Sequence, residues 1–311
     1  MNFLTNRRRL YAAIGSLILS YQCYAGEPQQ ISAECYLTVK PNQPERVVVL
    51  NQFAVENMLM LGLQGRMLAT AFPDEGYNQA FSEKLASIPQ LSPRWPSKEQ
   101  LLQLRPDFIY AGFPTAFGPS VLGEATQWQQ WGVGSLKSAA YCNAPSRPLE
   151  WQDLWTDISQ LAEIFDRKPQ LAQLRADKEA QLAALPVNKQ WRILHLDGLS
   201  QGARVAGSHS AADLLIRLAG GVNVAQALPH KWGTWSWEQV LISKPEVIVI
   251  AQSQSTEDSE VIKFLTEHPL LQKIDAVKHR RFITVPFSQA VTSPRLIEGV
   301  VTVNQALNKY K

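Results

Sequence analysis

Short apolar runs alternate with helical patterns along the first half of the chain. Runs of roughly four to eight apolar residues are typical of buried strands, and apolar residues spaced three or four apart are typical of covering helices. The strand-like runs are 46–50, 66–71, 107–110 and 133–136, and the helical patterns are 54–61, 98–104 and 127–131. This order predicts a first lobe over residues 34–145, with a parallel or mixed sheet covered by helices.

The middle of the chain carries helical patterns and no strand signal. Four apolar residues from Leu154 to Phe165 recur at helical spacing, which predicts an amphipathic helix. Pro169 suits the first turn of a second, longer helix over residues 169–185. We therefore expect residues 149–186 to form a helical connection between two halves of the molecule.

The alternation of strands and helices then restarts and defines a second lobe, residues 190–311. Strands are expected at 191–196, 247–250 and 281–285, and helices at 211–219 and 294–310. The fold class predicted from this pattern is α/β, with two Rossmann-like lobes that have short central sheets and are joined by one long α-helix.

One segment occurs twice, once in each lobe. Residues 97–112 read SKEQLLQLRPDFIYAG and residues 236–251 read SWEQVLISKPEVIVIA, with Ser, Glu, Gln, Leu, Pro and Ile identical at matching places. A serine N-cap followed by a glutamate suits a helix start, so either Glu99 or Glu238 alone needs no further explanation. Their equivalent positions in both halves indicate two lobes of similar plan.

The N-terminus has the features of a secretory signal peptide, residues 1–25. Three arginines at 7–9 precede a short apolar stretch, and Cys23-Tyr24-Ala25 suits cleavage after Ala25. An uncleaved anchor and a lipoprotein acylated at Cys23 are the alternatives; the cleavage site argues against the first and Gln22 against the second. We expect a periplasmic protein that is not embedded in the membrane.

Charge and cysteine content follow from this cleavage. The signal carries three of the 30 basic residues and no acids, so 27 basic and 27 acidic residues remain. Such a balanced chain has no basic field for nucleic acid or a membrane surface. Cys35 and Cys142 are the remaining cysteines, and an oxidising compartment favours a disulfide between them over two free thiols.

Several segments together resemble the helical-backbone class of periplasmic substrate-binding proteins of ABC importers, which includes ferric-siderophore, haem and cobalamin binders. The matching segments are 44–63, 97–112, 206–223, 236–251 and 293–297. The resemblance implies a ligand cleft between the lobes and only a small closure on ligand, because the connector is a rigid helix.

The same resemblance implies a partner and a binding role without catalysis. In the family, one exposed glutamate on each lobe contacts arginines of the dimeric permease, and Glu99 and Glu238 occupy these motif positions. We therefore expect a monomer that docks on a permease dimer, has no cofactor of its own and is not an enzyme.

Candidate ligand-binding residues lie in loops that follow the expected strands, where open α/β sheets bind ligands. The aromatic candidates are Phe53, Phe72, Trp95, Phe113, Phe117, Trp232 and Phe287. Arg94, Arg204 and Lys231 could neutralise an anionic ligand, although each could equally be an ordinary solvated charge. A ferric siderophore ranks first as ligand because most relatives bind iron complexes, with cobalamin and haem as alternatives.

Three other functions are weaker interpretations of the sequence. A bare zinc or manganese site needs several converging ligands, and only His209 and His230 form a plausible pair. A hydrolase could use Asp197, Ser208 and His209, but the chain lacks the G-x-S-x-G and H-E-x-x-H motifs. A sensory lobe that reports ligand to a membrane receptor shares the fold and stays open.

Overall fold

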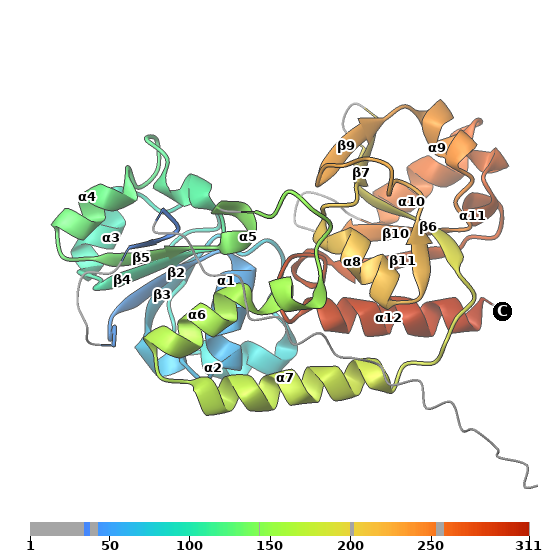
Figure 1. The fold of residues 1–311 in the computed structure, drawn as a ribbon. Coiled ribbons are helices and arrows are strands. Elements are labelled where there is room, and N and C mark those ends of the chain that lie inside the picture. Colours follow the sequence, from blue (N-terminus) through green and yellow to red (C-terminus); the bar gives the residue numbers. More distant parts are fainter. Residues whose placement is uncertain (1–33, 38–42, 143, 200–201, 253–257, 311) are drawn as a thin grey trace, which may run out of the picture.

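The computed structural model describes residues 34–37, 43–142, 144–199, 202–252 and 258–310. Two lobes, each built on its own sheet, stand side by side with helices around them (Figure 1). This confirms the predicted α/β fold class with two lobes. The expected signal peptide, residues 1–25, lies outside the described residues.

The N-terminal lobe has a mixed sheet with the strand order β1-β5-β4-β2-β3. Four of these strands pair in parallel and the short edge strand β1 is antiparallel to β5. The strands are β1 (Tyr36–Leu37), β2 (Val47–Leu50), β3 (Met67–Ala71), β4 (Phe108–Ala111) and β5 (Gly134–Lys137). Every residue of β2 and β4 is buried, because helices cover both faces of the sheet.

The helices of this lobe pack on opposite faces of the sheet. Helix α1 shares one apolar cluster with Val47 and Val49, whereas α3 and α4 share another with Val48 and Leu50. The helical segments are α1 (Gln52–Met60), η1 (Gln64–Arg66), η2 (Gln79–Phe81), α2 (Ser82–Leu85), α3 (Lys98–Leu104), η3 (Pro114–Phe117), α4 (Ala125–Gln130) and α5 (Ala139–Cys142).

The C-terminal lobe has a sheet with the order β11-β10-β6-β7-β9, and β8 pairs with β6. Strands β11, β10 and β6 are parallel neighbours, whereas β7 is antiparallel to both β6 and β9. The strands are β6 (Trp191–Gly198), β7 (Ala203–Ala206), β8 (Gly221–Asn223), β9 (Trp232–Trp235), β10 (Val247–Gln252) and β11 (Phe282–Pro286). Its helical segments are α8 (Ala211–Leu218), α9 (Trp237–Ser243), α10 (Asp258–Glu267), η5 (Leu271–Lys273), α11 (Asp275–Lys278), η6 (Phe287–Gln289) and α12 (Leu296–Lys309).

The connection between the lobes is helical. After η4 (Trp151–Trp155) and α6 (Thr156–Ile164), helix α7 (Lys168–Ala183) runs along the base of the molecule from one lobe to the other (Figure 1). Sixteen residues at 1.5 Å each give α7 a length of about 24 Å. An ion pair of 3.3 Å between Lys178 and Glu298 ties it to α12.

The apolar interior is continuous at this base and divided above it. One cluster joins β2, α1 and α6 of the first half with α8, β10 and α12 of the second. Two further clusters belong to one lobe each, on the sheet faces turned away from the shared cluster. The lobes therefore share a rigid base and separate on the opposite side.

The repeated segment forms the same structure in both lobes. In α3 and α9 the serine N-caps Ser97 and Ser236 each complete a capping box with the glutamine three residues later. Both helices end at a left-handed residue, Arg105 with φ 50° and Lys244 with φ 47°.

An arginine in each lobe accounts for this strained helix end. Arg46 donates to the carbonyl oxygens of Leu104 and Arg105, at 2.6 and 3.0 Å. Arg192 makes the equivalent bonds to Ser243 and Lys244, at 2.5 and 3.3 Å. The carbonyl groups left unpaired at the helix end are thereby satisfied, and the two units are structural duplicates.

Two further findings bear on the sequence analysis. Cys35 and Cys142 form a disulfide with a Cα–Cα distance of 5.8 Å, which confirms the predicted pairing. Within the described part of the chain, no helix combines the length and apolar character needed to cross a bilayer.

Candidate functional site

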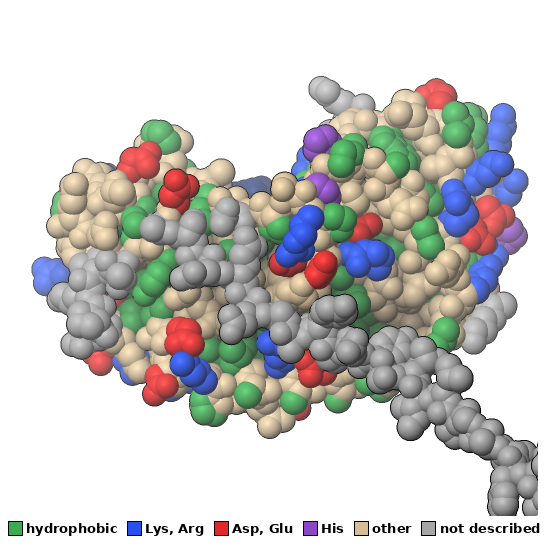
Figure 2. Space-filling model, in the orientation of Figure 1, with side chains coloured by type: hydrophobic (Ala, Val, Ile, Leu, Met, Phe, Trp, Pro, Cys, Tyr) green, Lys and Arg blue, Asp and Glu red, His purple; other side chains and the backbone are tan. Residues whose placement is uncertain are grey.

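A cleft of about 240 Å³ opens between the lobes, on the side opposite the shared base. The space-filling view shows the surface hollowed at this place (Figure 2). Residues of both lobes and of the segment after β11 line it: Phe113, Tyr141, Leu149, Asp197, Arg204, His209, Ser210, Ala211, Lys231, Trp232, Phe287, Ala290, Val291 and Thr292. Several of them follow strand ends, as expected for an α/β binding site.

Aromatic side chains form the wall on the N-terminal lobe. Phe113 and Tyr141 meet edge to face with their ring centroids 4.8 Å apart. Phe53 lies behind them, 5.5 Å from Phe113 and 5.9 Å from Tyr141, and is fully buried. Burial raises the pKa of Tyr141 far above its ordinary value, so its hydroxyl is neutral. The cleft thus has an apolar wall with one hydroxyl group.

Charged side chains of the C-terminal lobe face this wall. The Lys231 ammonium lies 4.6 Å from the centre of the Tyr141 ring and donates a hydrogen bond to the carbonyl of Ala140, across the cleft. Burial lowers the pKa of Lys231. Arg204 pairs with Asp197 at 2.8 Å, which leaves Lys231 as the uncompensated charge among these three residues.

Trp232 joins the charged and aromatic parts of the site. The Arg204 guanidinium lies 5.1 Å from the centre of its ring, a cation–π arrangement. Beneath it, the buried His195 ring is 6.0 Å away, and desolvation lowers the pKa of His195 to about 4. His195 is therefore neutral at neutral pH and adds no charge beside Trp232.

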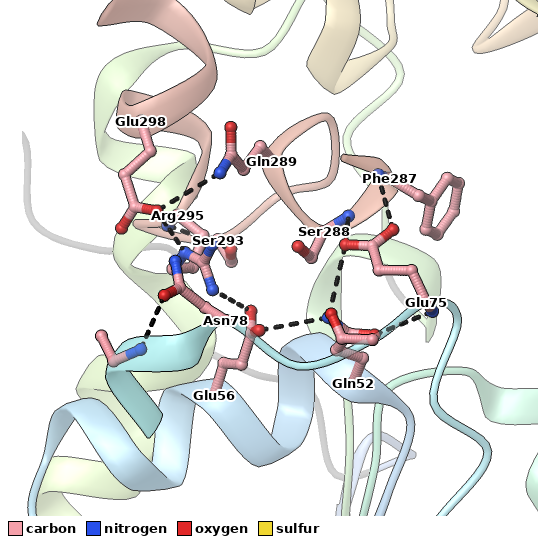
Figure 3. Close-up of polar contacts among 12 residues, drawn as sticks. Gln52, Glu56, Glu75, Asn78, Phe287, Ser288, Gln289, Ser293, Arg295 and Glu298 are labelled. Carbon is pink, nitrogen blue, oxygen red and sulfur yellow. Dashed lines mark hydrogen bonds and ion pairs between the residues drawn. The ribbon is translucent and has the colours of Figure 1, made fainter. Parts of the chain in front are cut away.

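A polar network ties the lobes together beside the cleft (Figure 3). The Glu75 carboxylate of the N-terminal lobe accepts hydrogen bonds from the backbone N–H groups of Phe287 at 2.7 Å and Ser288 at 3.0 Å. Gln52, on α1, donates to the same carboxylate at 3.3 Å. The two bonds to Phe287 and Ser288 join residues more than two hundred positions apart in the chain.

A buried ion pair forms the second part of the network. Arg295 contacts Glu56 at 2.7 Å and Glu298 at 2.8 Å, and both Arg295 and Glu56 are almost completely buried. Burial raises the pKa of Glu56 to about 7, although the positive charge of Arg295 opposes this shift. The lobes are therefore held by contacts that are sensitive to loss of either partner.

The structure places the ten predicted ligand residues in three groups. Phe113, Arg204, Lys231, Trp232 and Phe287 line the cleft.

The other five predicted residues are not among those that line it. Phe53 and Phe117 are core residues, because Phe53 is covered by Phe113 and Tyr141, and Phe117 packs with the α3 and α4 cluster. Phe72, Arg94 and Trp95 form a separate cluster, in which the rings of Phe72 and Trp95 are 4.6 Å apart.

Several residues of the site were not predicted from the sequence. Tyr141 directly precedes the disulfide residue Cys142 and follows β5, so its place after a strand was the available signal. Asp197 and His209 line the cleft but were not among the ten predicted ligand residues. Glu75 carried no local signal, and segment 293–297 indicated no role for Arg295 itself, because the partners of both residues are distant in sequence.

Glu99 and Glu238 lie at matching, exposed places on α3 and α9. Hydrogen bonds at the helix start lower the pKa of both carboxyl groups, chiefly from the Glu99 backbone and from the Ser236 side chain, so both are ionised. Exposed apolar side chains accompany them within one turn, Leu102 with 44% and Ile242 with 74% exposed. Each lobe thus presents an acid beside an apolar group.

A search of curated proteins found no match, but comparison with solved structures found many similar chains. A periplasmic binding protein from Veillonella parvula has 26% sequence identity and a TM-score of 0.77, with 86% of this chain and 92% of that chain covered. An ABC-type Fe³⁺-hydroxamate transport protein from Saccharomonospora viridis has 22% identity and a TM-score of 0.72, with 86% and 94% covered. A haem-binding protein of Vibrio cholerae has 21% identity and a TM-score of 0.66, with 85% and 98% covered.

The sequence profile of one family matches most of the chain. It is described as that of periplasmic binding proteins and matches residues 47–288. The two lobes, the helical connection and the cleft between them agree with this match. The chain therefore belongs to the periplasmic binding protein family.

Proposed function

We propose that this protein binds an anionic metal chelate, most simply a ferric siderophore, in the interlobe cleft and delivers it to the permease of an ABC importer. The observation that carries the proposal is one uncompensated lysine inside an aromatic cleft between two lobes. Aromatic rings suit the flat groups of a chelator, and a partly desolvated ammonium suits its negative charge.

The position of Lys231 indicates how a ligand enters. Lys231 reaches across the cleft to the Ala140 carbonyl. An anionic ligand offers a stronger, charge-assisted bond than a neutral carbonyl. On binding, the Lys231 ammonium would leave the Ala140 carbonyl and bond to the ligand. This movement would enlarge the cleft, whose volume of about 240 Å³ is small for a siderophore.

Haem or cobalamin is the second candidate. A flat macrocycle could lie between Tyr141 on one wall and Trp232 on the other, and the haem-binding protein of Vibrio cholerae shares the fold. Haem carries carboxylates that Lys231 and Arg204 could bind. Cyanocobalamin has no carboxylate and no net charge, which separates it from the other ligands experimentally.

A bare metal ion finds less support. Among the described residues, no group of three or more His, Cys, Asp or Glu side chains could hold a metal ion. His209 lines the cleft, but His195 is buried beneath Trp232. A chelated metal, whose ligands come from the chelator, fits such a site better.

Titration of the tryptophan fluorescence tests the ligand. Trp232 should report binding of a ferric catecholate, a ferric hydroxamate, haem, cyanocobalamin or Zn²⁺, each added separately. For an anionic chelate, Lys231→Met should weaken binding at least tenfold, and the exposed Lys263→Met on α10 should not. Binding of Zn²⁺ alone, or an equal effect of both variants, would contradict the proposal.

Delivery to the permease involves the duplicated helices. We assign Glu99 and Glu238 to contacts with cationic residues of a permease dimer, and place the protein in the periplasm after export by the signal of residues 1–25. An importer with twofold symmetry needs one acid on each lobe. Such exposed charges set orientation and association rate more than affinity.

Charge reversal separates docking from ligand binding. Glu99→Arg combined with Glu238→Arg should abolish ATP-dependent uptake into vesicles that contain the permease, with ligand affinity unchanged. Glu163→Arg combined with Glu179→Arg, which alters exposed acids on α6 and α7, is the matched control. Normal uptake with the first double variant would exclude the docking assignment.

A further inference from the structure

The segment that follows β11 supplies one side of the cleft. Phe287, Ala290, Val291 and Thr292 all line it. The segment belongs to the C-terminal lobe by sequence, but acids of the N-terminal lobe hold it at both ends (Figure 3). Glu75 binds its beginning at residues 287–288, and Glu56 binds Arg295 just beyond its end.

We propose that Glu75 is a positioning residue for the cleft: its carboxylate fixes Phe287 against the N-terminal lobe and, together with the Glu56–Arg295 pair, sets the spacing of the two lobes. The role of this spacing in ligand selection rests on the proposed function, whereas the contacts of Glu75 and Glu56 with the segment, together called the clamp, do not.

The geometry of the Glu75 carboxylate favours a fixed contact. Each of its two oxygens accepts one backbone N–H, Oε2 from Phe287 at 2.7 Å and Oε1 from Ser288 at 3.0 Å. These N–H groups belong to the first residues of the short helix η6, where donors have no partner within the helix. A charged acceptor that holds two successive donors restrains both the position and the rotation of η6.

The carboxylate is also fixed from its own lobe. Gln52 donates to Glu75 Oε1 at 3.3 Å and accepts from the Glu75 backbone N–H at 2.9 Å. Gln52 is buried on α1 and also contacts Glu56 at 3.2 Å. Glu56 therefore projects from α1 itself, and Glu75 projects from a loop that α1 supports. Through these two acids the clamp fixes the cleft-lining segment relative to α1.

The effect on the cleft follows from what Phe287 faces. Its side chain lines the cleft with Phe113 of the N-terminal lobe and Trp232 of the C-terminal lobe. If Glu75 released η6, the Phe287 ring could move, and of the two acids that hold the segment only Glu56, at Arg295, would remain. Loss of the carboxylate should therefore change the shape of the site and not simply its charge.

Replacement of Glu75 by glutamine tests the clamp without any ligand. The amide keeps the size of the side chain, but one of its two acceptors becomes a donor that faces a backbone N–H. Hydrogen–deuterium exchange should be at least tenfold faster in the peptide that contains residues 287–288. Glu45→Gln is the matched control, because the Glu45 side chain is exposed and pairs with Arg66, far from the cleft-lining segment.

The spacing of the lobes needs a separate measurement. Spin labels at Thr126→Cys on α4 and Glu267→Cys on α10, with the native disulfide intact, report the distance between the lobes. We expect one narrow distance distribution in the parent and in Glu45→Gln, and a broader or shifted one in Glu75→Gln. A purely stabilising role would lower the unfolding temperature without changing this distribution.

Unchanged exchange or an unchanged distance distribution in a folded Glu75→Gln protein overturns the proposal. If that variant does not fold, Ser288→Pro removes one donor from the opposite side of the same contact and is expected to give the same two changes. Failure of every ligand to bind would refute the proposed function but leave both of these measurements interpretable.

Discussion

Replacement of Arg295 by methionine tests how the two lobes are held together. The guanidinium is 2% exposed and contacts Glu56, which is 0% exposed, at 2.7 Å. Methionine fills similar space but leaves Glu56 buried without its counter-charge. Removal of one partner of a buried ion pair costs about 3–5 kcal/mol, so we expect the free energy of unfolding to fall by that amount at pH 8.

The loss should depend on pH in a defined direction. Burial already raises the pKa of Glu56 from 4.5 to about 7, and Arg295 is the largest opposing influence. Without Arg295 the folded-state pKa rises further. A carboxyl group with a raised folded-state pKa contributes stability that is complete below its unfolded pKa and is lost as the pH rises through the folded value. The variant should therefore be less impaired at pH 5.5 than at pH 8.

Urea denaturation followed by circular dichroism at these two pH values measures the effect. One proton limits the slope to about 1.4 kcal/mol per pH unit. Glu56→Leu combined with Arg295→Met should recover most of the loss, since neither charge of the buried pair remains. Arg66→Met, which breaks an exposed pair with Glu45, should cost less than about 1 kcal/mol. A pH-independent loss, or a double variant no better than Arg295→Met, would refute the reasoning.

Two other predictions concern the disulfide and the exposed apolar groups. Cys35→Ser combined with Cys142→Ser opens a loop with a sequence separation of 107. The free energy of unfolding, measured by urea denaturation, should fall by about 4–5 kcal/mol. Equal stability of the variant and the parent would contradict this prediction. Leu102→Asp combined with Ile242→Asp should reduce vesicle uptake at least tenfold without loss of ligand affinity, because these groups lie beside Glu99 and Glu238. Val187→Asp, which changes a 92% exposed residue after α7, should leave uptake normal, and equal loss with it would exclude a specific contact.

The sequence predicted the fold well because the relevant signals are local. Strand runs, serine N-caps and the stop at proline each occupy a few neighbouring residues, and the repeat shows the same unit twice. The left-handed conformation of Arg105 and Lys244 at the helix ends was not predictable in this way, since neither residue is a glycine. Arg46 and Arg192 stabilise those ends from a distance in sequence.

The cleft was predictable only in part. Phe113, Lys231 and Trp232 were found because they follow or begin strands at the expected edge. Phe53 belongs to the same region, but it is covered by Phe113 and Tyr141, and a sequence does not show which of several loop aromatics is outermost.

The interlobe network depends on the relative position of the two lobes. Glu75 and Phe287 are separated by 212 residues, and each is unremarkable in its own segment. The pairing becomes visible only once both lobes are placed on their shared base.

Location of the iron atom by anomalous diffraction tests the central claim most directly. Crystals soaked with a ferric catecholate and measured at the iron absorption edge should show their strongest peak in the cleft, between the Phe113–Tyr141 wall and Trp232, with Lys231 moved from the Ala140 carbonyl to the chelate. A strongest peak outside the cleft, or an iron atom bound directly by protein side chains without the chelator, would contradict the account.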